Sequence, residues 1–228
     1  MTTPMIASEG FALLEGLIEN NNREWFTANR QAFEDALIAP FAAILEAASE
    51  RLAAEGAALS GSRDTMFRMN RDVRFSKDNP PYKTAVSGVL TRSGKKSDDD
   101  GLAYLHLEAE GGFAAVGFYN LSPAALGPIR DAIIERAAAF DTVLGGLRAA
   151  GRELSDGKML SAMPRGYAEH AAHRHAEHLR RKSLIIKAPL DRSAWTSTDA
   201  TDALVRLVLD GMPLLDFVRS ARGVKIRA

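Results

Sequence analysis

The stretch from Met66 to Arg92 constrains the fold most, because it reads as two strands joined by a proline turn. Apolar and polar residues alternate along its first part with a period of two, which predicts a half-buried strand. The apolar set is Phe67, Met69, Val73 and Phe75, and the polar set is Arg68, Asn70, Asp72 and Arg74. Arg71 falls on the apolar face, so a bulge or a break is expected near it. Pro80 holds Asn79 extended, which predicts a turn over Ser76–Pro81 and a second strand over Lys83–Arg92.

The residues before this stretch predict an all-helical N-terminal quarter. Ser8 is placed to cap a helix over Glu9–Glu19, and the three asparagines that follow favour its end. A second helix is expected from Arg23, and Pro40 is expected to kink or restart it. A third helical segment then ends near Gly56.

The clearest hairpin lies between Leu102 and Tyr119, with Gly111-Gly112 as its expected turn. That register sets His106 opposite Gly117, which leaves room for a group to approach the imidazole. One face of the hairpin is apolar: Leu105, Leu107, Val116 and Phe118. The other face is amphipathic: Tyr104, His106, Glu108, Phe113 and Tyr119.

The second half of the chain predicts more helices and one short strand. Ser122-Pro123 is a start signal for a helix that runs to about Phe140. The remaining expected elements are a helix over Thr142–Ala149, a segment over Lys158–Leu160 paired to a sheet, a polar helix over Ala168–Arg181, a buried strand over Ser183–Ala188, and a long helix from Asp199 with a final turn from Pro213 to Ala221. These elements predict one α+β domain over residues 1–228, with a core from about residue 8 to 222. A helical N-terminal layer packs on a largely antiparallel sheet, and further helices follow it.

Composition excludes several classes of function. The 29 basic and 29 acidic residues cancel, which argues against a general polyanion binder but not against a local basic patch. The chain has no cysteine, so it has no thiol nucleophile and no cysteine-ligated metal. No stretch approaches the ~20 apolar residues of a membrane helix, and the N-terminus has no signal-peptide pattern. A cytoplasmic protein without membrane partners is therefore expected.

Positive charge is concentrated in the residues from Arg63 to Lys96. Nine basic residues stand there against three acidic ones, in a chain that is neutral as a whole. Guanidinium groups match the two oxygens of a phosphate or carboxylate, so the sequence predicts a site for an anionic ligand. Its members are Arg68, Arg71, Asp72, Arg74, Lys77, Tyr82, Lys83 and His106. The alternative is a structural network in which the arginines pair with glutamates of the N-terminal helices, such as Glu24 and Glu34.

Histidines offer two further candidates. His106 is the candidate catalytic residue, because imidazole exchanges protons near neutral pH, although a histidine in mid-strand is more often a packing residue. His170 and His173 are the candidate metal ligands, since their spacing places both on one helical face. That segment lacks a third ligand, so a solvated polar face is the alternative, and no metal or cofactor is expected.

Motifs for other chemistries are absent. There is no GxSxG nucleophile motif and no glycine-rich phosphate loop, because the SGKK at residues 93–96 lacks the leading glycine and the strand-to-helix setting. Nucleic acid is not expected as a partner, since Asp98, Asp99 and Asp100 adjoin Lys95 and Lys96 and would repel phosphate.

Three segments together resemble one family. They are Phe11–Glu34, which carries the NNxREWF pattern; RDVRFSKDNPPYKT at residues 71–84; and GYAEHAAHRHAEHLRRKSL at residues 166–184. They are similar to the family of conserved hypothetical proteins called DUF2461, a domain of unknown function found mainly in bacteria. Met69-Asn70 depart from the family's pattern, and His170, His175 and His178 are additional to it. The resemblance implies a single α+β domain and no established activity.

Two hypotheses for function remain open. In the first, the residues from 68 to 83 form a pocket for an anionic small molecule, with or without catalysis. In the second, the same surface is a non-catalytic interaction module that docks an acidic protein or a nucleic acid. A concave site that gathers Arg68, Arg74, Lys83 and His106 favours the first, and a flat basic face favours the second.

Overall fold

The computed structural model describes residues 4–71, 80–98 and 101–224. The N-terminal quarter is helical, as predicted. Its elements are α1 (Ser8–Glu19), α2 (Arg23–Ala28), α3 (Arg30–Phe33), the π-helix η1 (Glu34–Ile38) and α4 (Ala39–Ala54). Pro40 lies in the first turn of α4, directly after the π-helical turn. The chain thus accommodates Pro40 by restarting the helix, in one of the two ways that the sequence allowed.

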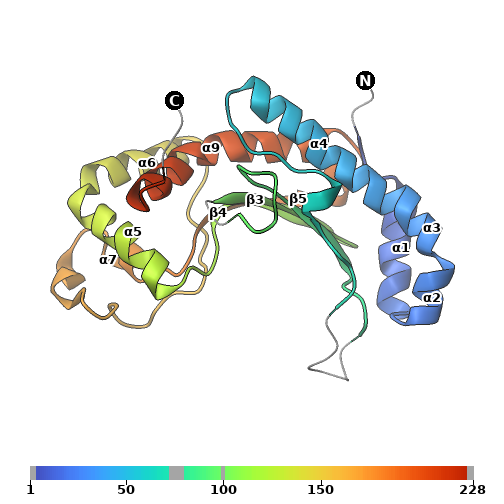
Figure 1. Cartoon of the computed structure of the whole chain (residues 1–228), viewed down its shortest axis with the longest axis horizontal. Coiled ribbons are helices and arrows are strands. Elements are labelled where there is room, and N and C mark those ends of the chain that lie inside the picture. The colour runs from blue at the N-terminus through green and yellow to red at the C-terminus, as the bar shows by residue number, and fades with distance from the viewer. Residues whose placement is uncertain (1–3, 72–79, 99–100, 225–228) are drawn as a thin grey trace. The chain divides into compact units, whose positions relative to one another are not determined.

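In the described residues, one sheet of five strands has the order β1-β2-β3-β4-β5, and β1–β2 and β2–β3 pair antiparallel. A short 3-10 helix, η2 (Arg63–Thr65), precedes it. The strands are β1 (Met66–Phe67), β2 (Ala85–Leu90), β3 (Leu102–Glu108), β4 (Gly111–Phe118) and β5 (Leu184–Asp191). The remaining helices are α5 (Pro123–Glu135), α6 (Ala137–Ala149), η4 (Ala168–Ala172), α7 (Ala176–Leu179), α8 (Arg192–Trp195) and α9 (Asp199–Ala221) (Figure 1). The predicted α+β class is confirmed.

The ladder between β1 and β2, which belong to the stretch from Met66 to Arg92, is shorter than predicted. Regular pairing covers Met66 and Phe67, which face Gly88 and Ser87. Past these pairs, an isolated bridge joins Asn70 to Tyr82. Between Phe67 and Asn70 one chain advances three residues, whereas its partner advances five from Ser87 to Tyr82. The extra residues therefore lie on the second strand, opposite the segment for which the sequence predicted a bulge or a break near Arg71, and the residues that follow Arg71 lie outside the described part. The predicted turn Ser76–Pro81 lies largely outside the described residues.

The hairpin of β3 and β4 turns earlier than predicted. β3 ends at Glu108 and β4 begins at Gly111, so Ala109 and Glu110 form the turn. The prediction that Gly111 and Gly112 form the turn is wrong, because both glycines belong to β4. Gly112 has a φ of 147°, and a Cβ on it would lie 1.9 Å from the carbonyl oxygen of His106. Only glycine fits so close to the neighbouring strand.

The described residues form two compact units. Unit 1 comprises residues 4–71, 80–98, 102–114 and 188–206, and unit 2 comprises residues 101, 115–187 and 207–224. The prediction of one domain over residues 1–228 stays a prediction.

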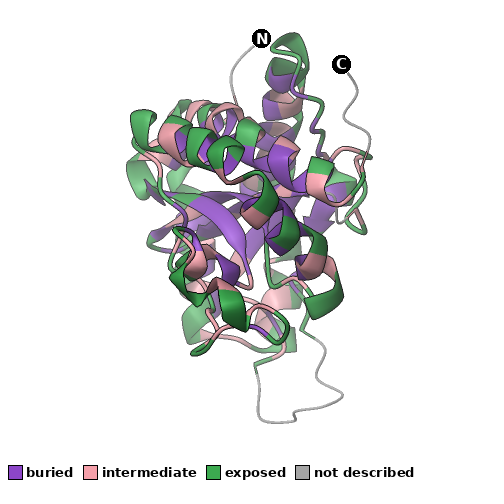
Figure 2. Ribbon diagram, turned by 90° about the vertical axis from the view of Figure 1, so that its left-hand side faces the viewer, coloured by how far each residue is buried: buried purple, intermediate pink, exposed green. Residues whose placement is uncertain are grey.

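Unit 1 packs α4 and the α8 region around a shared apolar core. Trp195 and Phe41 are fully buried, and their rings stack with centroids 6.0 Å apart. The backbone N–H of Ile6 donates to the carbonyl of Trp195 at 2.8 Å. Burial follows the strands and the inner sides of these helices (Figure 2). The N-terminal helices thus meet a segment almost two hundred residues later in the chain.

Asparagines of the first helical corner hold the proline-rich segment in place. Asn21 bonds the backbone of Tyr82 twice, donating from Nδ2 to the carbonyl and accepting from the N–H at Oδ1, both at 3.0 Å. The Tyr82 ring is 6% exposed and stacks on Phe26 with centroids 4.0 Å apart. Asn22 caps α2 by accepting from the N–H of Trp25. Two of the segments behind the family resemblance are therefore in direct contact.

Unit 2 packs α5, α6 and the C-terminal part of α9 together. Phe140 and Phe217 pack with ring centroids 5.1 Å apart, and the Arg136 guanidinium lies 5.0 Å from the Phe217 ring centroid. A Cβ on Gly211 would lie 2.9 Å from a methyl group of Val116, so glycine lets α9 approach the sheet closely. Ser122 caps α5 as predicted, by accepting from the N–H of Ala125.

The predicted polar helix over Ala168–Arg181 is wrong. The segment forms the 3-10 helix η4 and the short helix α7, and the backbone of His173 between them is extended, with ψ at 142°. Met159 pairs with Arg181, so the predicted pairing of residues 158–160 is made with the chain just before β5. Alanine, glutamate and arginine make up most of this segment and favour a helix, so tertiary contacts override the local propensity at His173.

Candidate functional site

The candidate site lies on one face of the sheet in unit 1. Cross-strand partners place Phe67 of β1, Ser87 of β2 and His106 of β3 side by side, so their side chains share a face. The opposite face meets α4, because a Cβ on Gly88 would lie 2.7 Å from a methyl group of Leu45. The face that carries His106 is therefore the one turned away from α4.

Four rings follow one another on this face. Centroid separations are 6.3 Å from Phe67 to Tyr104, 5.9 Å from Tyr104 to His106 and 5.0 Å from His106 to Phe113. Phe67 is 36% exposed, and the other three rings are half-buried. We call these four residues the aromatic face. Partly exposed rings at such separations offer flat surfaces for stacking.

Lys83 adds a positive charge beside the aromatic face. Its Nζ lies 5.7 Å from the ring centroid of Phe67, in the range of a cation–π contact. Within the part of the chain that the structure describes, no carboxylate lies at ion-pair distance from this ammonium group. The charge of Lys83 is therefore available to a ligand that reaches the rings.

Polar groups surround His106 on the same face. Its Nδ1 lies 3.1 Å from the Tyr104 hydroxyl, and its Nε2 lies 3.6 Å from a carboxylate oxygen of Glu108. The Ser87 residue opposite is 7% exposed. The arrangement provides hydrogen-bond donors and acceptors next to apolar ring surface, the usual composition of a small-molecule site. The prediction that Gly117 lies opposite His106 is wrong, because Phe113 occupies the position opposite His106.

The structure brings only part of the predicted anion site together. Lys83 and His106 both contact rings of the aromatic face: Lys83 lies beside Phe67, and His106 lies between Tyr104 and Phe113. Tyr82 packs into the core against Phe26. Arg71 is exposed, and its Nε donates to the carbonyl of Tyr82 at 3.1 Å. Arg68 is exposed, and in the described residues it makes no ion pair. The other predicted members, Asp72, Arg74 and Lys77, lie outside the described residues.

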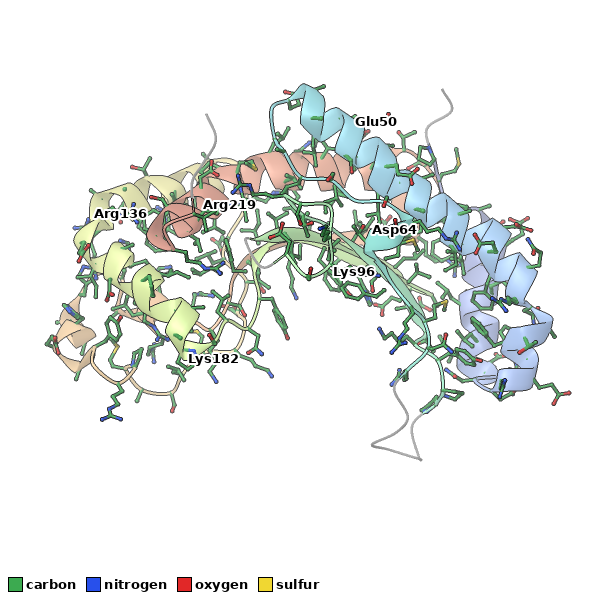
Figure 3. The ribbon with its side chains drawn as sticks, in the orientation of Figure 1. Glu50, Asp64, Lys96, Arg136, Lys182 and Arg219 are labelled. Atoms are coloured by element: carbon green, nitrogen blue, oxygen red, sulfur yellow. The ribbon has the colours of Figure 1, made fainter. Side chains whose placement is uncertain are left out.

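Some of the basic residues serve the fold. Arg63 makes a two-point ion pair with Glu34, the kind of partner that the structural alternative named. This pairing lowers the pKa of the Glu34 carboxyl, chiefly through the hydrogen bond from Arg63. Lys96, labelled in Figure 3, donates from Nζ to the carbonyl of Met66 on the edge strand β1, at 2.8 Å. Arg63 and Lys96, at the two ends of the basic run, therefore serve the fold, whereas Lys83 lies beside the aromatic face.

The histidine-rich segment of unit 2 holds the two candidate metal ligands, His170 and His173, for which the sequence offered no third ligand. His170 and His173 have ring centroids 6.3 Å apart. Within the described ranges, no group of three or more histidine, aspartate or glutamate side chains is arranged to hold a metal ion. His175 is buried, with its Nε2 3.1 Å from Asp141. The partner of His175 is therefore a carboxylate of the protein itself.

The surroundings of His178 lower the pKa of its imidazole. Burial lowers the pKa of its imidazole to about 4, and the positive charge of Arg181 acts in the same direction. His175 and Arg148 lower this pKa further, whereas Glu177 opposes them. The folded protein therefore holds His178 neutral across the physiological range.

Acidification should destabilise the protein through His178. The unfolded chain takes up this proton near its ordinary pKa of ~6.5, and the folded chain only near 4. The stabilisation is complete above pH ~6.5 and is lost as pH falls toward 4, by ~1–2 kcal/mol after allowance for partial exposure. Thermal melts of the wild type and His178→Asn between pH 7.5 and 4.5 should show a smaller loss in the variant. Equal losses in both proteins would contradict this role.

Sequence reasoning missed how the site is composed. Phe67 was assigned to the apolar side of its strand, but its cross-strand partner is Ser87, which faces His106, so Phe67 lies on the aromatic face. Ser87 received no role, although its partner His106 was a candidate. The signal that was available is the alternation along β3, which set Tyr104, His106 and Glu108 on one side.

The fold and the site together define an α+β protein with a half-exposed aromatic and cationic surface on its sheet. No helix in the described residues is both long and apolar enough to cross a membrane. The chain belongs to the family of conserved hypothetical proteins DUF2461, whose model matches residues 9–217. A search of curated proteins gave no match.

Proposed function

We propose that unit 1 binds an anionic small molecule with a planar apolar part on its aromatic face. The observation that carries the proposal is Lys83, a cation without a carboxylate partner in the described residues, beside a row of half-exposed rings. Rings of the ligand stack on Phe67, Tyr104 and Phe113, and its phosphate or carboxylate group pairs with Lys83.

His106 supplies polar recognition in this proposal. Its Nδ1 and the Tyr104 hydroxyl lie 3.1 Å apart. A hydroxyl or amino group of a ligand stacked on the aromatic face meets both a donor and an acceptor there. This role does not require proton transfer, so the proposal is a binding function. A catalytic role for His106 stays a prediction.

Binding of simple probes tests the proposal. Calorimetry with phenyl phosphate, benzyl alcohol and inorganic phosphate separates the ring from the charge. We expect phenyl phosphate to bind most tightly, because it alone satisfies both the rings and Lys83. Replacing Lys83→Gln should weaken phenyl phosphate about tenfold, the value of one charge-assisted contact. The matched control is Lys95→Gln, an exposed lysine in the same basic run.

Two outcomes would count against the proposal. Equal affinity of phenyl phosphate for the wild type and Lys83→Gln would remove the role of the cation. Tighter binding of a single-stranded oligonucleotide or an acidic peptide than of phenyl phosphate would favour the interaction-module hypothesis instead.

A further inference from the structure

A cavity in unit 2 lies apart from the aromatic face. Its volume is ≈ 270 Å³, and it is formed by the end of α6, the chain that follows α6, and α7. A second hollow of ≈ 610 Å³ shares half of this lining. The charged and polar side chains of the cavity are Arg148, Arg152, Glu153, Asp156, Glu177, His178 and Arg181. Three leucines supply the apolar remainder: Leu144, Leu147 and Leu154.

Two of the cavity's arginines are held in place from behind. The Arg181 side chain is 6% exposed and donates to the carbonyl of Ser155 and to Glu177. Arg152 is 20% exposed, and its Nε lies 3.0 Å from Asp210. Because other groups fix these guanidinium planes, a ligand need not order them, which lowers the entropic cost of binding.

The charges are arranged by depth. The carboxylates belong to the rim: the Asp156 side chain is 99% exposed and that of Glu177 is 57% exposed. The guanidinium groups of Arg181 and Arg152 lie deeper. Exposed carboxylates are screened by water, whereas buried cations keep their field. Asp210 is as little exposed as Arg152 and offsets its charge, so the positive field of the interior comes from Arg181, whose carboxylate partners Asp156 and Glu177 lie at the rim.

Hydrogen-bonding capacity remains unused at this site. Arg181 Nε and His178 Nδ1 are buried and have no hydrogen-bond partner in the described part of the chain. The side chain of Arg148, on the last turn of α6, makes no ion pair or hydrogen bond with another described residue. A buried polar group without a partner is rare in native proteins and calls for an explanation such as strain, a catalytic role, or a bound water or ion.

We propose that this cavity is a second binding site, for a small oxyanion such as a phosphate, sulfate or carboxylate group. Arg148 closes on the anion from the rim, and Arg181 presents its guanidinium from the wall. Arginine suits this task because its planar fork matches two oxygens of the anion. His178 and Arg181 reach the anion with their unpartnered nitrogens after a small shift of the wall, since solvent does not reach those atoms in the present conformation.

His178 reports occupancy of the site. The positive charges of Arg181 and Arg148 contribute to its lowered pKa. An anion between these two arginines compensates their charge, so binding should raise the pKa of His178. A merely structural cavity has no reason to couple this pKa to phosphate.

Phosphate titrations of the full chain test the site. Calorimetry should detect one saturable phosphate site that Arg148→Gln weakens about tenfold, the value of one charged contact. Arg165→Gln, an exposed arginine elsewhere in unit 2, should leave the affinity unchanged. Lys83→Gln should also leave it unchanged, which separates this site from the aromatic face. Because Arg148 is exposed, its replacement is not expected to unfold the protein.

NMR pH titration of the histidine rings supplies the second readout. With sodium phosphate present, the His178 resonance should titrate at a higher pH than without it, and sulfate should act similarly. No saturable binding, equal affinity in Arg148→Gln, or a His178 titration that ignores both anions would each overturn the proposal.

Discussion

Replacing Gly112 by alanine is expected to destabilise the protein by more than ~4 kcal/mol, in the range reserved for severe backbone or packing conflicts. An added Cβ would lie 1.9 Å from the His106 carbonyl oxygen, and the φ of 147° is one that side chains rarely adopt. The hairpin that carries the aromatic face has to separate to relieve both conflicts. Thermal melts should show a midpoint lower by ~10 °C or more.

Gly145→Ala is the matched control for this change. Gly145 lies inside α6, and a Cβ there meets nothing within 4 Å. The same substitution should raise stability by ~0.5–1 kcal/mol, because alanine favours the helix over glycine. Equal effects of the two substitutions would contradict the close approach of β4 to β3.

Replacing Tyr82 by alanine is expected to lower the free energy of unfolding by ~3–5 kcal/mol, as for other buried aromatic residues. Its ring is 6% exposed and stacks on Phe26, and its backbone is bonded to Asn21. Removing the ring leaves a cavity between α2 and the segment that leads into β2. Chemical denaturation of Tyr82→Ala measures the loss.

Tyr82→Phe separates packing from a ligand contact through the hydroxyl. In the described residues the hydroxyl makes no hydrogen bond, so this variant should stay within ~1 kcal/mol of the wild type. It should also bind phenyl phosphate as the wild type does. A large loss of binding in Tyr82→Phe would restore the hydroxyl to the site, as the sequence first suggested.

The alternation of residues predicted which side chains share a face better than it predicted their neighbours. Tyr104, His106 and Phe113 were placed on one side of the hairpin, and their ring contacts confirm it. The turn was misplaced because Gly111-Gly112 is a strong turn signal. Moving the turn to Ala109-Glu110 brings Phe113, and not Gly117, opposite His106. Since that shift spans an even number of residues, each side chain keeps its face.

Long-range pairing explains what the sequence could not predict. Nothing near Tyr82 in the chain indicates that Asn21 bonds its backbone, because the two lie 61 residues apart. The charge run likewise gave no means to separate Arg63, which pairs with Glu34, from Lys83, which lies by Phe67. Charge patterns report where cations are concentrated, whereas the partners depend on tertiary contacts.

The most direct test of the aromatic face is an NMR titration of aromatic side chains with phenyl phosphate. We predict saturable shifts of the ring signals of Tyr104, His106 and Phe113 in the wild type, at concentrations where Lys83→Gln shows little change. Ring signals that stay unperturbed while phenyl phosphate binds elsewhere, or does not bind, would contradict the account.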